Sequence, residues 1–333
     1  MAYSVIKKPS DYFNTKLYTG TGATQSITGV GFQPDFTWIK NRNSTNSHEA
    51  FDSVRGATKT LYPNTTDAEY VNLTNSLTSF DSDGFTVGGG AGANQSGSGI
   101  ASWNWLANGA GVANTDGSIN STVSANTTSG FSIVKWTGNS TAGQTIGHGL
   151  GVTPKVVIIK RLSGSAQSWI CKFPTATDGY LALDTTDAVS ASSGWLPVSS
   201  SLITLANNWS AYNNNGNDFI AYCFADVQGY SKFSSYVGNG NADGTFVYTG
   251  FKPSFVMVKR TDIGDNWLIK DIKRDPINQM EKRIFPNLSN AEDTGAGGNY
   301  DFLSNGFKLR ESDAIGNASG GTYIYMAFAE EPL

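Results

Sequence analysis

The feature of this chain that most restricts its fold is a segment that occurs three times. Each copy has a proline and then an apolar stretch that ends in lysine six residues after the proline. The copies are GFQPDFTWIKNR (31–42), GVTPKVVIIKR (151–161) and GFKPSFVMVKR (250–260). The spacing of the first two, with no gap, also aligns LYPNTTDA (61–68) with LALDTTDA (181–188). Such a long repeat predicts that one folding unit is present three times.

Two further segments recur in each copy and set its limits. Each copy closes with an apolar segment that lacks charge: IASWNWLA (100–107), FIAYCFA (219–225) and YIYMAFA (323–329). Each also opens with a short strand-like segment that ends in Gly20, Gly138 or Gly238. The sequence therefore predicts three domains, at residues 1–110, 128–230 and 231–333. The stretch 108–130, rich in Gly, Ser, Thr and Asn, is expected to be a polar linker.

The pattern within a copy is typical of an all-β fold. Short segments rich in β-branched and aromatic residues alternate with Gly, Asn and Asp turns. The best hairpin signals are FDSDGF (80–85) and FLSNGF (302–307), where Asp-Gly or Asn-Gly suits a tight turn. A unit of about 100 residues can bury its own core. We therefore expect three tandem antiparallel β-sandwich modules, jelly-roll or laminin-G-like, with Trp38, Trp103 and Trp105 in the core.

Composition excludes several classes of protein. Among the 333 residues only 15% are charged, and the net charge is −4, so electrostatics favour neither nucleic acid nor an anionic membrane as partner. The N-terminus has no apolar stretch of signal-peptide length, and no stretch is long enough to span a membrane. Neither secretion nor membrane insertion is expected. Cys171 and Cys223 lie in apolar strand-like segments and are expected to be small buried residues, with a disulfide the less favoured alternative.

Histidine and metal chemistry find little support. The two histidines, His48 and His148, have no aligned histidine in another copy, and both are expected in loops with a solvated or turn-forming role. No cluster of His, Cys or carboxylate residues has metal-ligand spacing, and no cofactor motif is present. We therefore expect no metal and no cofactor.

Acid pairs are the remaining route to catalysis, because two carboxylates suffice for glycoside hydrolysis. The candidates are Glu49 with Asp52, and Glu69. Asp52 and Arg55, however, recur as Asp271 and Arg274, while the second copy has Lys172 and Thr175 at that spacing. A duplicated Asp/Arg pair favours an ion pair that holds a loop. We therefore predict that the chain is not an enzyme and has no catalytic residue.

One region differs between the copies and is the candidate contact surface. Trp195, Trp209 and Tyr212 lie in a polar stretch with no counterpart in the other copies. Exposed aromatic rings stack on sugars, so these three residues are the predicted contacts for a glycan or a protein partner.

Four motifs carry a resemblance to a known family. They are KLYTGTGATQSI (16–27), GFQPDFTWIKNR (31–42), FDSVRGA (51–57) and ASWNWLANG (101–109). This set resembles a family of uncharacterised repeat proteins from tailed bacteriophages, many of them marine or cyanobacterial, which are labelled tail fibre, coat or virion structural protein. The match is close over residues 1–110 and weaker in the other two copies, which lose the DSVRG loop wholly or partly.

The resemblance implies a virion component that is assembled in the host cytoplasm. We therefore expect a structural protein on the particle surface, as a capsid decoration or a tail fibre or tip protein. Its expected partners are other virion proteins and further copies of itself. A receptor- or carbohydrate-binding adhesin that contacts a host-surface glycan is the alternative, and a glycan depolymerase is the less favoured third.

Overall fold

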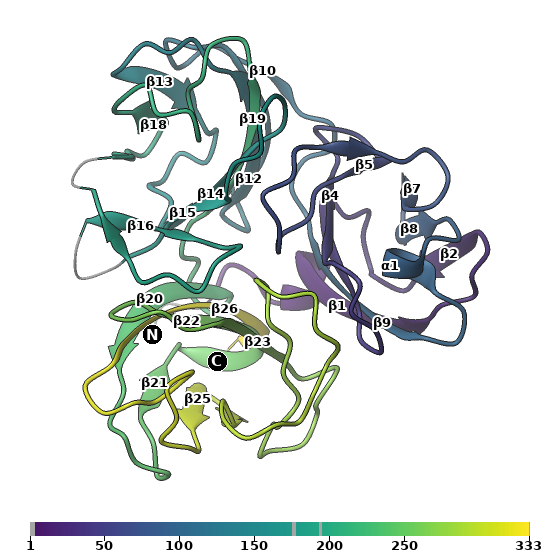
Figure 1. Cartoon of the computed structure of the whole chain (residues 1–333), viewed down its shortest axis with the longest axis vertical. Helices are drawn as coiled ribbons and strands as arrows, with labels where there is room; N and C mark the ends of the chain where they lie inside the picture. Colours follow the sequence, from purple (N-terminus) through teal and green to yellow (C-terminus); the bar gives the residue numbers. More distant parts are fainter. Residues whose placement is uncertain (1–3, 175–177, 193–194, 333) are drawn as a thin grey trace.

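The computed structural model describes residues 4–174, 178–192 and 195–332 and is built almost entirely from antiparallel strands. The predicted all-β class is confirmed. Figure 1 shows three lobes arranged around a common centre. We call them module 1 (13–105), module 2 (112–224) and module 3 (231–332).

Modules 1 and 3 share one topology. Each has a four-stranded sheet, in the orders β1-β9-β3-β4 and β20-β26-β22-β23, and a three-stranded sheet, in the orders β2-β8-β7 and β21-β25-β24. The strands of module 1 are β1 (Phe13–Thr19), β2 (Gln25–Thr28), β3 (Phe36–Asn41), β4 (Glu49–Asp52), β7 (Leu77–Asp81), β8 (Gly84–Val87) and β9 (Gly99–Trp105). Those of module 3 are β20 (Ser231–Val237), β21 (Phe246–Tyr248), β22 (Phe251–Arg260), β23 (Trp267–Asp271), β24 (Tyr300–Leu303), β25 (Gly306–Leu309) and β26 (Thr322–Pro332).

Module 2 repeats the arrangement within a wider sheet, of order β10-β11-β12-β19-β14-β15-β16-β17, beside the pair β13-β18. Its strands are β10 (Val112–Asn114), β11 (Ser121–Asn126), β12 (Phe131–Thr137), β13 (Gln144–Gly147), β14 (Val156–Arg161), β15 (Ile170–Lys172), β16 (Gly179–Ala182), β17 (Ser190–Ala191), β18 (Leu202–Leu205) and β19 (Asp218–Phe224). The expected linker at 108–130 is therefore wrong, because β10 and β11 lie within it. Only a few of their side chains are apolar, since two strands at the edge of a sheet bury little area.

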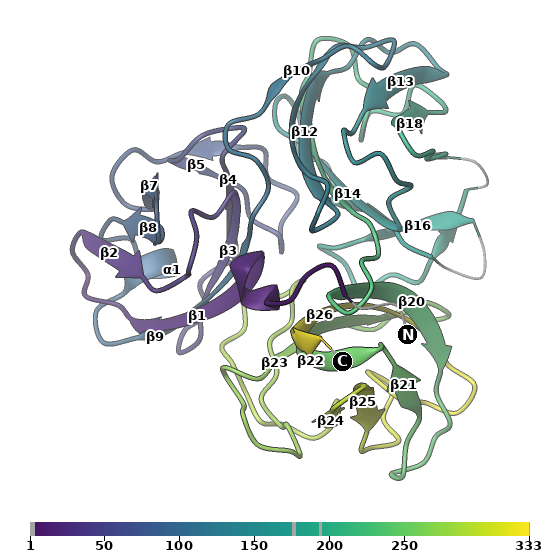
Figure 2. The same ribbon diagram turned by 180° about the vertical axis from the view of Figure 1, so that it is seen from behind.

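The remaining elements are short. They are a 3₁₀ turn η1 (Pro9–Asp11), one helical turn α1 (Ala91–Asn94), and the pair β5 (Lys59–Thr60) and β6 (Tyr70–Val71). Figure 2 shows the N-terminal segment crossing from η1 to module 3, where the C-terminal strand β26 also lies. Ser4 donates a hydrogen bond to the carbonyl oxygen of Gln228, and Ile6 is buried, so this segment joins module 1 to module 3.

The recurring segments form the central strands of each module. The opening segments become β1, β12 and β20, the proline segments become β3, β14 and β22, and the closing segments become β9, β19 and β26. The predicted hairpins are confirmed as β7-β8 and β24-β25. In the first of them Gly84 has a φ of +147°, a backbone region in which glycine is favoured.

Hydrophobic clusters occupy two kinds of place. Each module encloses a cluster of its own between its two sheets, as expected. A further cluster combines apolar residues from all three modules at the centre of the molecule. It forms because both faces of the recurring strands are buried: every residue of β3 and β14 is buried. The three modules are therefore packed around one shared core.

Strand register shows which residues correspond at this core. Trp105 of β9 pairs with Phe36, Phe224 of β19 pairs with Val156, and Phe328 of β26 pairs with Phe255. Trp103, Tyr222 and Met326 are two residues before these positions and share their face. The same strand positions of three modules thus meet at the centre.

Candidate functional site

The recurring NTTDA segment lies in a loop that contacts the neighbouring module. We call these segments the docking loops: 62–69 in module 1, 182–189 in module 2 and 285–292 in module 3. Module 1 contacts module 2 through three hydrogen bonds of its docking loop. Trp169 Nε1 donates to the carbonyl oxygen of Tyr62 at 3.0 Å, Gln167 N to that of Thr66 at 3.0 Å, and Glu69 N to that of Leu162 at 3.0 Å.

The same contacts recur between module 2 and module 3. Trp267 Nε1 donates to the carbonyl oxygen of Ala182 at 3.0 Å. Lys259 Nζ donates to the carbonyl oxygen of Thr186 at 3.2 Å, and Val189 N donates to that of Thr261 at 2.9 Å.

Module 3 returns to module 1 and closes the ring. His48 Nε2 lies 3.1 Å from the carbonyl oxygen of Phe285, and Lys40 Nζ donates to that of Ser289 at 3.0 Å. Glu292 N donates to the carbonyl oxygen of Arg42 at 2.9 Å, and the two side chains form an ion pair at 2.6 Å. Because each docking loop grips the next module, the recurring residues serve mainly to hold the ring together.

The lysine that ends each proline segment belongs to these contacts. Lys40, Lys160 and Lys259 are fully buried, and burial lowers the pKa of each to about 8. Each ammonium donates to backbone carbonyl oxygens, which satisfies it in place of water. Their recurrence is therefore explained by packing between modules.

The duplicated Asp/Arg pair forms the predicted ion pair and has a second role. The buried carboxylate of Asp52 accepts from Arg55 Nε at 2.5 Å and from the Tyr222 hydroxyl of module 2 at 2.7 Å. Its counterpart Asp271 is paired with Arg274 and accepts from Trp103 Nε1 of module 1 at 3.1 Å. Each pair thus holds a loop and also receives a donor from another module.

Module 2 lacks this pair, and the change is matched across the interface. Register aligns Phe173 with Asp52 and Asp271, one position beyond the expected Lys172, because module 2 has one extra residue before β15. Met326 occupies the position of Trp103 and Tyr222 and has no hydrogen-bond donor. Phe173 and Met326 are both buried in the shared core. An apolar residue thus replaces the carboxylate where the donor is also missing.

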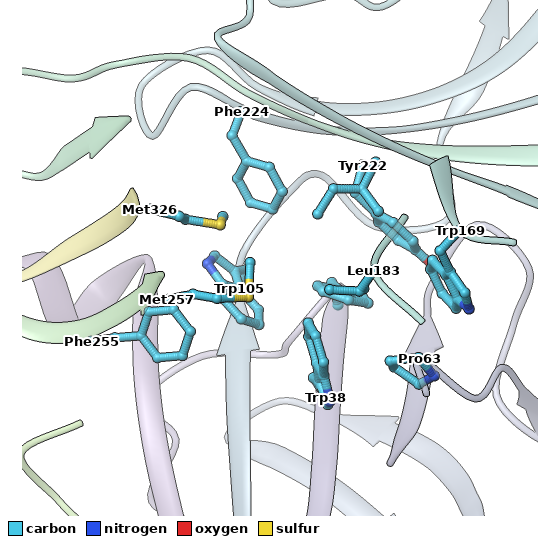
Figure 3. A pocket seen from close by; sticks show the side chains of 12 residues that line it. Trp38, Pro63, Trp105, Trp169, Leu183, Tyr222, Phe224, Phe255, Met257 and Met326 are labelled. Atoms are coloured by element: carbon cyan, nitrogen blue, oxygen red, sulfur yellow. The ribbon is translucent and has the colours of Figure 1, made fainter. Parts of the chain in front are cut away.

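Figure 3 shows a small cavity at the centre, where aromatic rings and methionines of the three modules converge. Trp105, Phe224 and Met326 line it, one from each module. Its volume is about 20 Å³, which is room for about one water molecule, and its lining is apolar. It is a packing gap, too small to hold a ligand.

The predicted contact residues of the divergent region lie inside module 2. Trp195 and Tyr212 are buried in its own core, where Trp195 Nε1 donates to the carbonyl oxygen of Gly179 at 2.9 Å. Trp209 packs against Tyr180, with ring centroids 4.8 Å apart, and is half-buried. Trp195 and Tyr212 therefore offer no exposed ring, contrary to the expectation. A local surplus of Asn and Ser around them conceals their core position in the sequence.

Both histidines are buried, and the expectation of solvated loop positions is wrong for them. His48 occupies the position of Trp169 and Trp267 in the ring of docking contacts. Its Nδ1 accepts from Trp38 Nε1 at 2.9 Å, and Nε2 faces the carbonyl oxygen of Phe285. Only the neutral ring with its proton on Nε2 satisfies both partners. His148 lies beside the carbonyl oxygen of Ser199 at 3.2 Å.

Acid should weaken the fold through His48. Burial, with a smaller contribution from the charge of Lys40, holds the pKa of His48 well below its usual value of 6.5. The unfolded chain then takes up a proton below pH 6.5 that the folded chain does not, so stability falls as the pH drops from 6.5. We expect a loss of about 1.4 kcal/mol per pH unit from this residue.

Urea unfolding of wild type and His48→Gln between pH 7 and 5 measures this effect. The His48→Gln variant should lose stability less steeply by one proton, whatever its stability at pH 7. Equal slopes in the two proteins would refute the assignment. His148, whose pKa burial also lowers, contributes to both slopes and cancels in the comparison.

The remaining chemistry in the described part of the chain is sparse. Within it, no three His, Cys, Asp or Glu side chains gather closely enough to hold a metal ion. Cys171 and Cys223 are buried and unpaired, as expected. Among the same residues no helix has the length and apolar character needed to cross a membrane.

Fold and interfaces together define a class of protein: an all-β chain whose three related modules close into a ring around a shared core. The chain belongs to the family described as Domain of unknown function (DUF7483), whose model matches residues 8–332. That match runs through all three modules, so the family unit is the whole ring. Comparison with curated proteins finds no match, and comparison with solved structures finds none.

Proposed function

We propose that the chain is a non-enzymatic structural protein exposed on the surface of a tailed-phage virion, as a capsid decoration or a tail fibre or tip protein. The observation that carries the proposal is the use of the recurring polar residues. Lys40, Asp52 and their counterparts are buried in contacts between modules, where they stabilise one body. The four phage-like motifs support the virion assignment.

The ring supports this role physically. A body with one shared core presents its outer loops at fixed positions, and many copies on one particle add weak contacts through effective concentration. Its partners are then other virion proteins and further copies arranged by the symmetry of the particle.

The test is the position of the protein in the particle. Peptides of this chain should be found by mass spectrometry in purified particles of the phage that encodes it, in many copies per particle. Antibody-gold labelling should mark the surface of the capsid or the tail. Absence from purified particles, or labelling only of the infected-cell lysate, would contradict the proposal.

The alternative, an adhesin that binds a host-surface glycan, is favoured by a polar pocket at Glu49, outside the region first expected to hold it. A depolymerase is the least supported of the three. Asp52 is fully buried between Arg55 and Tyr222, and Glu69 is paired with Arg55 at 3.1 Å. A general acid or base must reach its substrate, and Asp52 has no exposed surface.

A further inference from the structure

A pocket of about 340 Å³ opens on module 1 beside β4 and α1. Its lining is polar on most sides and contains no lysine or arginine: Asn46, Ser47, Glu49, Tyr62, Asp67 and Gly92. A volume of this size falls in the range of small-ligand sites. Unlike the central cavity, it can hold more than a water molecule.

Glu49 is the residue that the scaffold does not explain. Its position in the strand corresponds to Ile170 in module 2 and Leu268 in module 3, both buried and apolar. Glu49 is itself 9% exposed, and its Oε2 is buried without a hydrogen-bond partner among the described residues. An unpaired buried carboxyl oxygen costs stability, so an apolar residue would serve the fold better here.

Gly92 makes the space that Glu49 needs. A Cβ atom at Gly92 would lie 2.1 Å from Glu49 Oε1, which is far inside van der Waals contact. Any larger residue in α1 would displace the carboxyl group. Module 1 therefore combines an acid at a core position with a glycine that admits it.

We propose that this pocket binds a neutral, hydroxyl-rich ligand of the saccharide class, with Glu49 as the buried hydrogen-bonding group. A saccharide hydroxyl both donates and accepts, so it can satisfy the unpaired Oε2. Asn46, Ser47 and Asp67 add polar groups around the opening, and Tyr62 supplies a half-buried aromatic ring. Amphipathic aromatic rings together with amide and carboxyl groups match the faces and edges of a sugar ring.

Other ligand classes fit less well. An anion would meet the carboxylate of Asp67 with no cation in the lining. A divalent cation prefers six to eight oxygen ligands with several charges. Here Asp67 is exposed, and burial raises the pKa of Glu49 to about 7, which leaves the site weakly charged at neutral pH. The inference is independent of whether the protein is a virion component.

The test is binding of the intact chain to a glycan array that carries neutral, sulfated and sialylated oligosaccharides, followed by calorimetric titration with the neutral ones that bind. We expect saturable binding to neutral oligosaccharides. Glu49→Leu, which installs the residue of module 3, and Gly92→Ala should each weaken binding at least tenfold. Asp67→Asn, at an exposed position, should weaken it severalfold without disturbing the core. Trp209→Ala, in module 2, is the matched control and should bind as wild type does.

Melting temperatures separate lost binding from lost folding. Glu49→Leu should melt at or above the wild-type temperature at pH 8, because it removes an unpaired buried acid. No binding to any neutral glycan, binding only to acidic glycans, saturable Ca²⁺ binding that Glu49→Leu abolishes, or binding that is lost in Trp209→Ala and kept in Glu49→Leu would each overturn the proposal.

Discussion

Replacement of Trp105 by alanine should lower the free energy of unfolding of the whole chain by about 3–5 kcal/mol. The Trp105 ring lies in the shared core and contacts aromatic rings of all three modules. Ring centroids lie 4.8–6.3 Å apart in this group, which comprises Phe13, Phe36, Phe224, Phe255 and Phe328. The cavity left by alanine would add to the gap already present beside it, so little of the loss can be recovered by collapse.

Trp105→Phe is the matched control, because Phe224 and Phe328 occupy the corresponding positions. Phenylalanine keeps an aromatic ring and removes an indole N–H that has no partner in the described part of the chain. We expect it to cost far less than alanine. Chemical denaturation of both variants measures the difference, and equal losses would show that ring packing at this position does not hold the modules together.

Replacement of Asp52 by alanine should also destabilise the protein by about 3–5 kcal/mol, because it leaves Arg55 buried without its partner. Asp11→Ala is the control. Asp11 pairs with Lys8 at the same distance of 2.5 Å and the same sequence separation, but on the surface. Exposed pairs contribute about 0–1 kcal/mol, so this variant should be nearly neutral.

A double-mutant cycle isolates the contact between modules. Tyr222→Phe removes the hydroxyl that donates to Asp52 from module 2. Hydrogen bonds to charged groups contribute about 1.5–3 kcal/mol, so Tyr222→Phe should cost much less in the Asp52→Ala background than in wild type. Additive losses would mean that this bond does not couple the two modules.

The strands of each module could be predicted from the sequence, because their repeats combine apolar residues with turn signals at fixed places. The ring could not be predicted in the same way. Alternation shows that a strand has a buried face, whereas β3 and β14 are buried on both faces. The available signal was the nearly continuous apolar run in VVIIKR (156–161), which is typical of strands covered on both sides.

The candidate site was harder to predict than the fold. The acid Glu49 was noted in the sequence, but its significance depends on the aligned Ile170 and Leu268, and register rather than sequence spacing reveals that alignment. Trp195 and Tyr212 were expected at a surface because polar residues surround them, yet aromatic rings in a polar stretch can still turn inward.

The central claim is that three modules share one core and unfold as one body. Differential scanning calorimetry of the full chain tests it most directly, through the number of transitions and the ratio of calorimetric to van't Hoff enthalpy. We expect a single transition with a ratio near one, and Trp105→Ala should shift that whole transition to lower temperature. Two or three separable transitions, with Trp105→Ala shifting only one of them, would contradict the shared core.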